Sequence, residues 1–222
     1  SVVVGRGERM PLQNRAERFG EIHAVSSRGL FTGNRGVIHD PATKTLLNRR
    51  WTTKAWIICE CDFRGRRREV MGRNSPSGQA GWTELFFLDE VTALAAGHRP
   101  CFYCRRERAV EFERCFSAGQ GRETISAPEM DAILHRERWA SRRGHDRSGG
   151  LRASDLSGLP PGAIVTAKER PYARSDGGWL AWSFEGWSPA AEPTVPAALM
   201  SPPATVAALL AGYAPIWHPS AG

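Results

Sequence analysis

The sequence predicts an α+β protein with a β-rich N-terminal part, central helices and a small C-terminal antiparallel β meander. Three observations predict this class. Apolar and polar residues alternate along residues 56–63 with the period of a strand. Glycine and proline punctuate a helical pattern at residues 89–100, and short apolar segments separated by turn residues follow residue 163. Hydrophobic residues make up 41% of the chain and charged residues 24%, which is the composition of a folded globular protein.

The first third is expected to be β-rich. Residues 33–36 (GNRG) are a turn signal. Residues 56–63 are expected as a strand, and after an arginine-rich turn residues 67–71 return as its partner. Because side chains alternate between the two faces of a strand, the first strand should present one face made of Ile57, Cys59, Cys61 and Phe63.

The helical middle begins after a short apolar strand at residues 85–88. Asp89 is a candidate N-cap, because its carboxylate can accept hydrogen bonds from the first-turn amides of the following helix. That helix is expected over residues 90–96. Gly97 then supplies the C-terminal stop, since glycine adopts the left-handed conformation that ends many helices.

Two longer helices are expected next. Pro100 suits the first position of a helix over residues 101–116, because proline has no backbone N–H to satisfy there. A further helix over residues 127–140 shows apolar residues at helical spacing. Its buried face should contain Met130, Ile133 and Leu134.

Composition predicts the domain organisation. Residues 10–140 are expected to form the α+β core, and residues 141–162 are basic and then rich in Ser, Gly and Pro, as in a linker. Residues 163–222 should form the small β meander with a short terminal helix, packed on the core. Its strands are expected at 163–167, 171–174 and 179–184, with a turn at Gly177-Gly178 and the helix at 205–211.

Two ten-residue segments resemble each other. Residues 91–100 read VTALAAGHRP and residues 206–215 read VAALLAGYAP. Both describe a helix stopped by glycine, after which proline restarts the chain. Ile216 and Pro219 follow the second copy where Cys101 and Cys104 follow the first, so the cysteines are an addition to a scaffold that does not need them.

The charge balance suits a polyanionic partner. The net charge is +7 and the pI is near 9.6, which favours nucleic acid. All but three of the 30 basic residues are arginines, a skew that a GC-rich genome also produces without selection for binding. No apolar run approaches the roughly 18 residues that span a bilayer, and the N-terminal apolar run is too short for a secretory signal. A cytoplasmic protein without a membrane segment is therefore expected.

The cysteines indicate a metal site. Their odd number, without a secretory signal, does not describe a disulfide framework. Cys101 and Cys104 form a C-x-x-C flanked by arginines, which is half of a tetrahedral zinc site. Redox use of the pair and inert thiols are the alternatives. The remaining ligands are open among Cys59, Cys61, His98, His39 and His218.

A resemblance to a known family covers residues 86–105 (FFLDEVTALAAGHRPCFYCR). This segment resembles the second half of the zinc-binding domain of Ada-type DNA methylphosphotriester-repair proteins. The resemblance implies a zinc ion held by four cysteines, one of which accepts a methyl group from the DNA backbone. Residue by residue, only Cys101 and Cys104 match ligand positions; the family's methyl acceptor belongs to an upstream C-x-x-x-C, where this chain has Cys59-x-Cys61.

A second candidate site lies at the arginine-rich turn. Arginine pairs with phosphates and tryptophan stacks on bases, so the combination is typical of nucleic-acid binding. A solvated arginine-rich loop with core tryptophans is the alternative. The candidate nucleic-acid-binding residues are Arg64, Arg66, Arg67, Arg68 and Trp51.

A third candidate supports a different function, an enzyme acting on a small phosphate-bearing molecule. His39 and Asp40 are its candidate catalytic residues, with the histidine as general base. The candidate phosphate-binding residues are Arg35, Arg99 and Arg105. Of the two functions, the sequence favours a zinc-knuckle-containing, nucleic-acid-associated protein, in DNA repair or processing.

Overall fold

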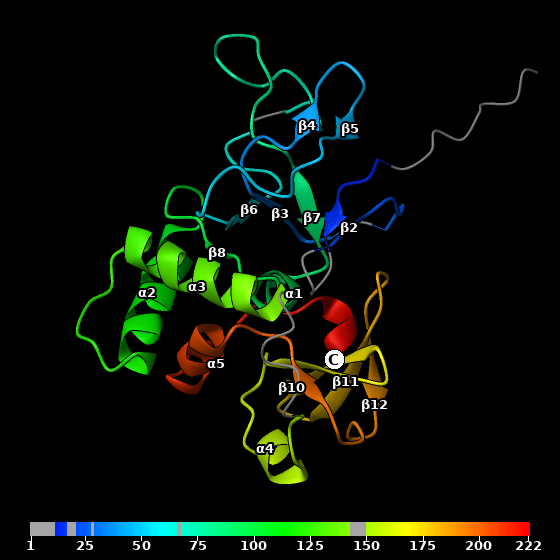
Figure 1. Ribbon diagram of the computed structural model, residues 1–222, viewed down its shortest axis with the longest axis vertical. Coiled ribbons are helices and arrows are strands. Elements are labelled where there is room, and N and C mark those ends of the chain that lie inside the picture. The colour runs from blue at the N-terminus through cyan, green and yellow to red at the C-terminus, as the bar shows by residue number, and fades with distance from the viewer. Residues whose placement is uncertain (1–11, 17–20, 28, 66–67, 143–149) are drawn as a thin grey trace, which may run out of the picture.

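The computed structural model describes residues 12–16, 21–27, 29–65, 68–142 and 150–222 (Figure 1). Within these residues the fold is α+β, as predicted, with an N-terminal mixed sheet, a central group of helices and a C-terminal antiparallel sheet. None of the helices in these ranges is long and apolar enough to cross a membrane.

The N-terminal sheet is six-stranded, in the order β2-β1-β7-β3-β6-β8. The pairs β1–β7 and β6–β8 are parallel and the other neighbours are antiparallel. Phe31, Ile58, Leu85 and Phe87 fill its buried face. The strands are β1 (Arg15–Ala16), β2 (Ile22–His23), β3 (Phe31–Asn34), β6 (Ile57–Glu60), β7 (Leu85–Phe87) and β8 (Arg99–Pro100), and the separate two-stranded hairpin is β4 (His39–Asp40) with β5 (Thr45–Leu46).

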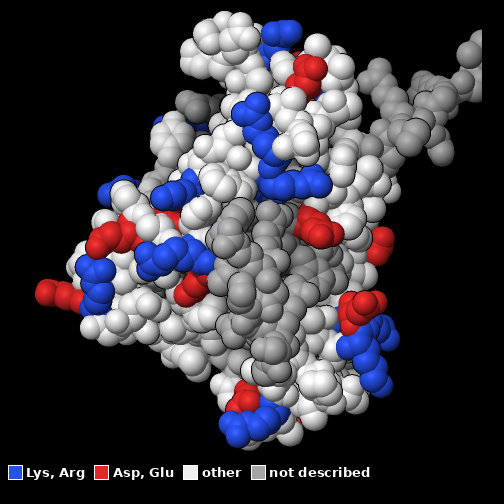
Figure 2. Space-filling view, viewed as in Figure 1, with Lys and Arg blue, Asp and Glu red and all other residues white. Residues whose placement is uncertain are grey.

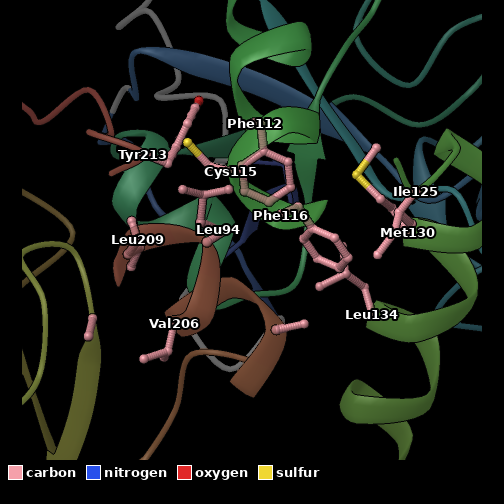
Figure 3. Packing of buried hydrophobic residues seen from close by; sticks show 13 residues of the cluster. Leu94, Phe112, Cys115, Phe116, Ile125, Met130, Leu134, Val206, Leu209 and Tyr213 are labelled. Atoms are coloured by element: carbon pink, nitrogen blue, oxygen red, sulfur yellow. The ribbon is translucent and has the colours of Figure 1, made fainter. Parts of the chain in front are cut away.

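The central helices share one hydrophobic core with the C-terminal part of the chain (Figure 3). Phe112 and Phe116 on one helix meet Met130 and Leu134 on the next, and Leu209 packs against them from the C-terminal helix. This core joins residues 163–222 to the first part of the chain. The helices are α1 (Glu90–Ala95), α2 (Arg106–Gly119), α3 (Ala127–Arg142), α4 (Ala153–Ser157) and α5 (Pro203–Leu210).

The C-terminal sheet confirms the predicted meander and extends it. Its five strands are antiparallel in the order β12-β11-β10-β9-β13. Ile164, Leu180 and Trp187 on this sheet pack against Leu88 and Val91. The strands are β9 (Ile164–Ala167), β10 (Arg170–Ser175), β11 (Gly178–Trp182), β12 (Trp187–Ala190) and β13 (Ala198–Leu199), and a 3-10 turn covers Pro219–Ala221.

Three local predictions are wrong. The described residues 68–71 are not a strand, because β6 takes its partners from β3 and β8 instead. The fully buried residue of β6 is Ile58, so the face that packs into the core is not the predicted one. The linker predicted at 141–162 stays a prediction: its described part contains α4, and residues 143–149 lie outside the described ranges.

The third wrong prediction concerns the cysteine pair. The predicted helix from residue 101 begins only at Arg106, and Pro100 lies in β8. The reason is strand pairing: the Cys101 amide donates to the Ile58 carbonyl (3.0 Å), which extends the ladder past Pro100. The Cys101–Cys104 pair therefore occupies a turn between a strand and a helix.

The two similar segments do form the same structure. Each helix ends in a glycine with positive φ, Gly97 at 82° and Gly212 at 100°. In each, the next residue donates its amide back to a helical carbonyl, His98 to Ala93 (3.0 Å) and Tyr213 to Ala208 (3.1 Å). Both residues after the glycine, His98 and Tyr213, are consequently turned into the core.

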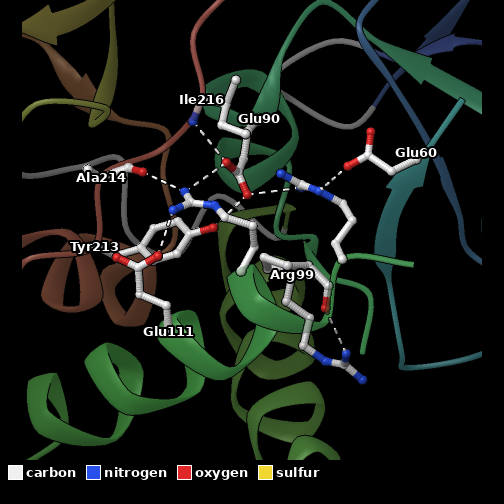
Figure 4. A network of polar contacts seen from close by, with 10 residues as sticks. Glu60, Glu90, Arg99, Glu111, Tyr213, Ala214 and Ile216 are labelled. Atoms are coloured by element: carbon white, nitrogen blue, oxygen red, sulfur yellow. Dashed lines mark hydrogen bonds and ion pairs between the residues drawn. The ribbon is translucent and has the colours of Figure 1, made fainter. Parts of the chain in front are cut away.

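Two adjacent buried carboxylates, Asp89 and Glu90, hold the start of α1 to the C-terminal tail. Asp89 caps α1 as predicted, through the Thr92 amide, and also accepts from the Trp187 indole (2.6 Å). Glu90 is fully buried and accepts from four groups (Figure 4). These are Tyr213 Oη (2.6 Å), Arg105 Nη1 (3.0 Å), Arg108 Nη2 (3.2 Å) and the Ile216 amide (2.8 Å).

Glu90→Gln is expected to destabilise the protein by about 3 kcal/mol, because it removes the buried charge that pairs with both Arg105 and Arg108. Urea unfolding of the wild type and the variant measures the loss. Glu123→Gln, on an exposed residue, is the matched control and should change the free energy of unfolding by less than about 0.5 kcal/mol. Equal stability of the two variants would show that Glu90 is not a structural hub.

His98 is a buried, neutral histidine. Its ring lies 4.6 Å from that of Phe87 and 5.2 Å from that of Trp56, measured between centroids. Arg35 donates from Nε toward His98 Nε2 (3.5 Å). Burial, and then the charges of Arg35 and Arg138, hold the pKa of His98 well below its ordinary value of 6.5.

This depressed pKa makes stability depend on pH in one direction. Below pH 6.5 the unfolded chain protonates His98 while the folded chain does not, so stability falls as the pH falls. The contribution of this residue is at most about 1.4 kcal/mol per pH unit. Urea unfolding at a series of pH values should give a steeper acid-side loss for the wild type than for His98→Gln; parallel curves would contradict the assignment.

Candidate metal centre

Three cysteine thiols gather at the junction of β6, β8 and α2. The Sγ atoms of Cys59, Cys101 and Cys104 all lie within 4.8 Å of one another. Cys101 is buried, and Cys59 and Cys104 are half-buried. They form the only group of three or more potential metal ligands at this spacing in the described part of the chain.

Parallel pairing of β6 with β8 creates this cluster. The register places Ile58 opposite Pro100, so that the next residues along the two strands, Cys59 and Cys101, lie side by side. The turn after Cys101 then brings Cys104 back, because the Arg105 amide donates to the Cys101 carbonyl (2.9 Å). Residues 101–104 thus form a tight turn, called the knuckle below, which faces the end of β6.

The knuckle stabilises a thiolate. Hydrogen bonds from the thiols of Cys104 and Cys59, supported by the backbone amides of Cys104 and Tyr103, lower the pKa of Cys101 to about 2. The hydrogen bonds that Cys59 makes with Cys101 and, to a smaller extent, with Cys104 raise the pKa of Cys59, and burial adds to this effect. The hydrogen bond with Cys101 likewise raises the pKa of Cys104. A cation that displaces the remaining protons would replace these shared hydrogen bonds with thiolate bonds.

An ion pair between the neighbours of two cysteines holds the cluster together. Glu60 follows Cys59 and Arg105 follows Cys104, and Arg105 Nε lies 2.9 Å from Glu60 Oε1. The Arg105 side chain is fully buried and its guanidinium lies 4.2 Å from the Phe31 ring centroid. The strand and the knuckle are therefore tied together by the residues beside their thiols.

The donor set indicates a thiophilic cation. Three thiolates favour zinc or another soft ion over magnesium or calcium, which prefer oxygen ligands. Zinc is four-coordinate in most protein sites, and three protein ligands leave one coordination position for another group. The cluster thus selects Cys59 from the ligands that the sequence left open.

The four other open ligands are occupied elsewhere. Cys61 is exposed and its thiol donates to the Leu30 carbonyl (3.4 Å). His98 lies between aromatic rings, as described above. His39 Nδ1 bonds with Thr83 Oγ1 (2.7 Å), on a distant segment, and His218 Nδ1 bonds with Ser220 Oγ (2.8 Å) in its own turn.

The candidate catalytic pair lies away from the cysteines, in the β4–β5 hairpin (Figure 1). His39 is buried, and besides Thr83 its ring contacts the Gly72 carbonyl (3.4 Å). Asp40 caps its own turn by accepting from the Ala42 amide (2.9 Å). These contacts give both residues a structural role, and catalysis by them stays a prediction.

The three candidate phosphate-binding arginines are buried. Arg35 is fully buried, with its guanidinium 4.0 Å from the Trp56 ring centroid. Arg99 makes a bidentate ion pair with Asp131, at 2.8 Å for both bonds. Arg105 pairs with Glu60 and Glu90. Their guanidinium groups contact other side chains of the protein, so phosphate binding by these three arginines stays a prediction.

The arginine-rich turn is only partly described. Arg66 and Arg67 lie outside the described residues. Arg68 pairs with the buried Glu84 (2.8 Å) and lies 4.1 Å from the Trp82 ring centroid, whereas Arg64 is exposed beside Phe63. On the face in Figure 2, basic side chains lie singly or in small groups, several beside acidic ones.

Trp51, which the sequence places with Arg49, Arg50 and the arginine-rich turn, lies against helix α3. Its ring makes an edge contact with His135 on α3, at 4.7 Å between centroids. Arg138, one turn further along α3, donates to the Lys54 carbonyl (2.9 Å). The segment containing Arg49, Arg50, Trp51 and Lys54 is thereby fixed against α3. Only the tertiary pairing of a loop with a helix shows this, and no local signal in the sequence could have found it.

Comparisons of this chain with known proteins give no match. No protein-family model matches it, and neither the curated proteins nor the solved structures provide a match. Its function must therefore be inferred from the geometry of the cysteine cluster and of the surrounding surface.

Proposed function

We propose that this is a zinc-binding protein in which Cys59, Cys101 and Cys104 hold the ion. The observation that supports this is the mutual approach of the three Sγ atoms, within 4.8 Å, from two segments distant in the sequence. Zinc matches the site better than iron–sulfur clusters, which take four cysteines. Bound zinc would join β6 to the knuckle before α2.

Purified wild-type protein is expected to contain about one zinc per chain by mass spectrometry, because the thiols already converge. Cys59→Ser should lose as much zinc as Cys101→Ser or Cys104→Ser. Cys115→Ala is the matched control, since Cys115 is buried in the helical core, away from the cluster.

Zinc retention in Cys59→Ser would exclude Cys59 as a ligand and leave only Cys101 and Cys104 as cysteine ligands. Wild-type protein that carries no metal after purification and takes none from a zinc solution would make the thiols structural only.

As a second candidate, we propose association with nucleic acid, in the repair or processing class that the Ada-type resemblance suggests. The net charge of +7 supports this, together with one basic, aromatic surface. Arg49, Arg50 and Lys54 are exposed around the half-buried Trp51, a combination suited to phosphates and bases. This surface replaces the turn at residues 64–68 as the best-placed candidate.

Binding to a single-stranded oligonucleotide should weaken as salt is raised, because phosphate contacts release counterions. Arg49→Gln with Arg50→Gln should lower the slope of log affinity against log salt by about 1 to 2. Lys168→Gln with Arg170→Gln removes two exposed charges on the C-terminal sheet as the matched control. Fluorescence anisotropy measures both variants, and an unchanged slope in the first would remove this surface from consideration.

A further inference from the structure

We propose that the metal held by Cys59, Cys101 and Cys104 keeps its fourth coordination position open to a thiol from outside the chain. This inference rests on the proposed zinc centre and concerns what that centre binds. It follows from the donors that the chain supplies, from the contacts of the nearest other donors and from the surroundings of the cluster.

The chain supplies three donors in the described residues. No other His, Cys, Asp or Glu ligand atom of the described residues joins the three thiols within 4.8 Å. A tetrahedral ion bound there would have one position without a ligand from the described residues. That arrangement is typical of zinc sites that react or exchange ligands, whereas structural zinc sites are closed by four protein ligands.

The two nearest other donors in the sequence are directed to different partners. Glu60 follows Cys59 along the strand, and successive side chains of a strand point to opposite faces. Its Oε1 is already 2.9 Å from Arg105 Nε. Cys61, two residues beyond Cys59, lies past the end of β6 with its thiol on the Leu30 carbonyl.

The cluster can be approached from solvent past an apolar rim. Cys59 and Cys104 are half-buried, and Tyr103 between the knuckle cysteines has 58% of its surface exposed. The Tyr103 ring makes an edge contact with Phe63, at 5.3 Å between centroids. Leu30, the carbonyl partner of Cys61, is also exposed. Such a rim favours a ligand with carbon groups over a small hydrated anion.

The donor set selects the class of ligand. Three thiolates and Zn²⁺ together carry one negative charge, which makes the ion soft and a weak Lewis acid toward hard oxygen anions. A thiol suits this centre: its sulfur forms the fourth metal bond, a bound water leaves, and the thiol proton passes to solvent. The guanidinium of Arg64 lies 5.1 Å from the centroid of the Phe63 ring, which in turn contacts Tyr103.

Cobalt-substituted protein tests the proposal, because its absorption reports the number of thiolate ligands. Wild type and Cys61→Ser should give the same three-thiolate spectrum. Adding 2-mercaptoethanol should raise the sulfur-to-cobalt charge-transfer band by roughly one third, from three thiolates to four, in both proteins. Gel filtration confirms that cobalt stays with the protein.

Three other results of the cobalt experiment would each contradict a specific part of the proposal. A four-thiolate spectrum before addition, reduced in Cys61→Ser, would make Cys61 the fourth ligand and close the site. A spectrum that does not respond to thiol would show that the position is filled or inaccessible. Failure of the wild type to bind cobalt or zinc would overturn the metal centre itself, independently of the fourth ligand.

Discussion

The buried carboxylate of Glu90 is the interaction on which most of the structure depends. A carboxylate without solvent is stable only if its oxygens are fully satisfied, and Glu90 meets this condition with donors from α2, from the knuckle and from the C-terminal tail. Those donors come from residues 105 to 216, so one side chain determines how the tail lies on the helices. The neighbouring Asp89 connects the C-terminal sheet to the start of α1, because it accepts a hydrogen bond from the Trp187 indole.

The cysteine cluster depends on the same network. Arg105 reaches Glu90 on one side and Glu60 on the other, and it directly follows Cys104. The knuckle is thus positioned by an ion pair and by the β6–β8 ladder, before any cation is bound. Small zinc modules that fold only with metal lack such support. Here the large shared core provides the folding free energy, so a metal in the proposed centre would not be required for folding and could exchange its fourth ligand without unfolding the chain.

Local chemistry made part of this structure predictable. Asp89 and Gly97 were found because capping and left-handed glycine depend on a few adjacent residues, and the meander was found because its turns are short. The parallel β6–β8 pairing was not found, since it depends on contacts across forty residues. Because of this pairing, residues 99–100 form a strand and the helix expected from residue 101 begins only at Arg106. The pairing also places Cys59, and not Cys61, beside the knuckle.

The positive charge of the chain has two separate uses. Arg99 and Arg105 were expected at phosphates because they flank the cysteines, yet both neutralise buried carboxylates. Arginine suits that position because its planar fork can satisfy a carboxylate bidentately inside a core. The exposed charges that remain near Trp51 lie on a different segment, held to α3 and not to the knuckle. The proposed metal site and the proposed nucleic-acid surface therefore rest on structurally independent groups, so that evidence for one proposal gives no support to the other.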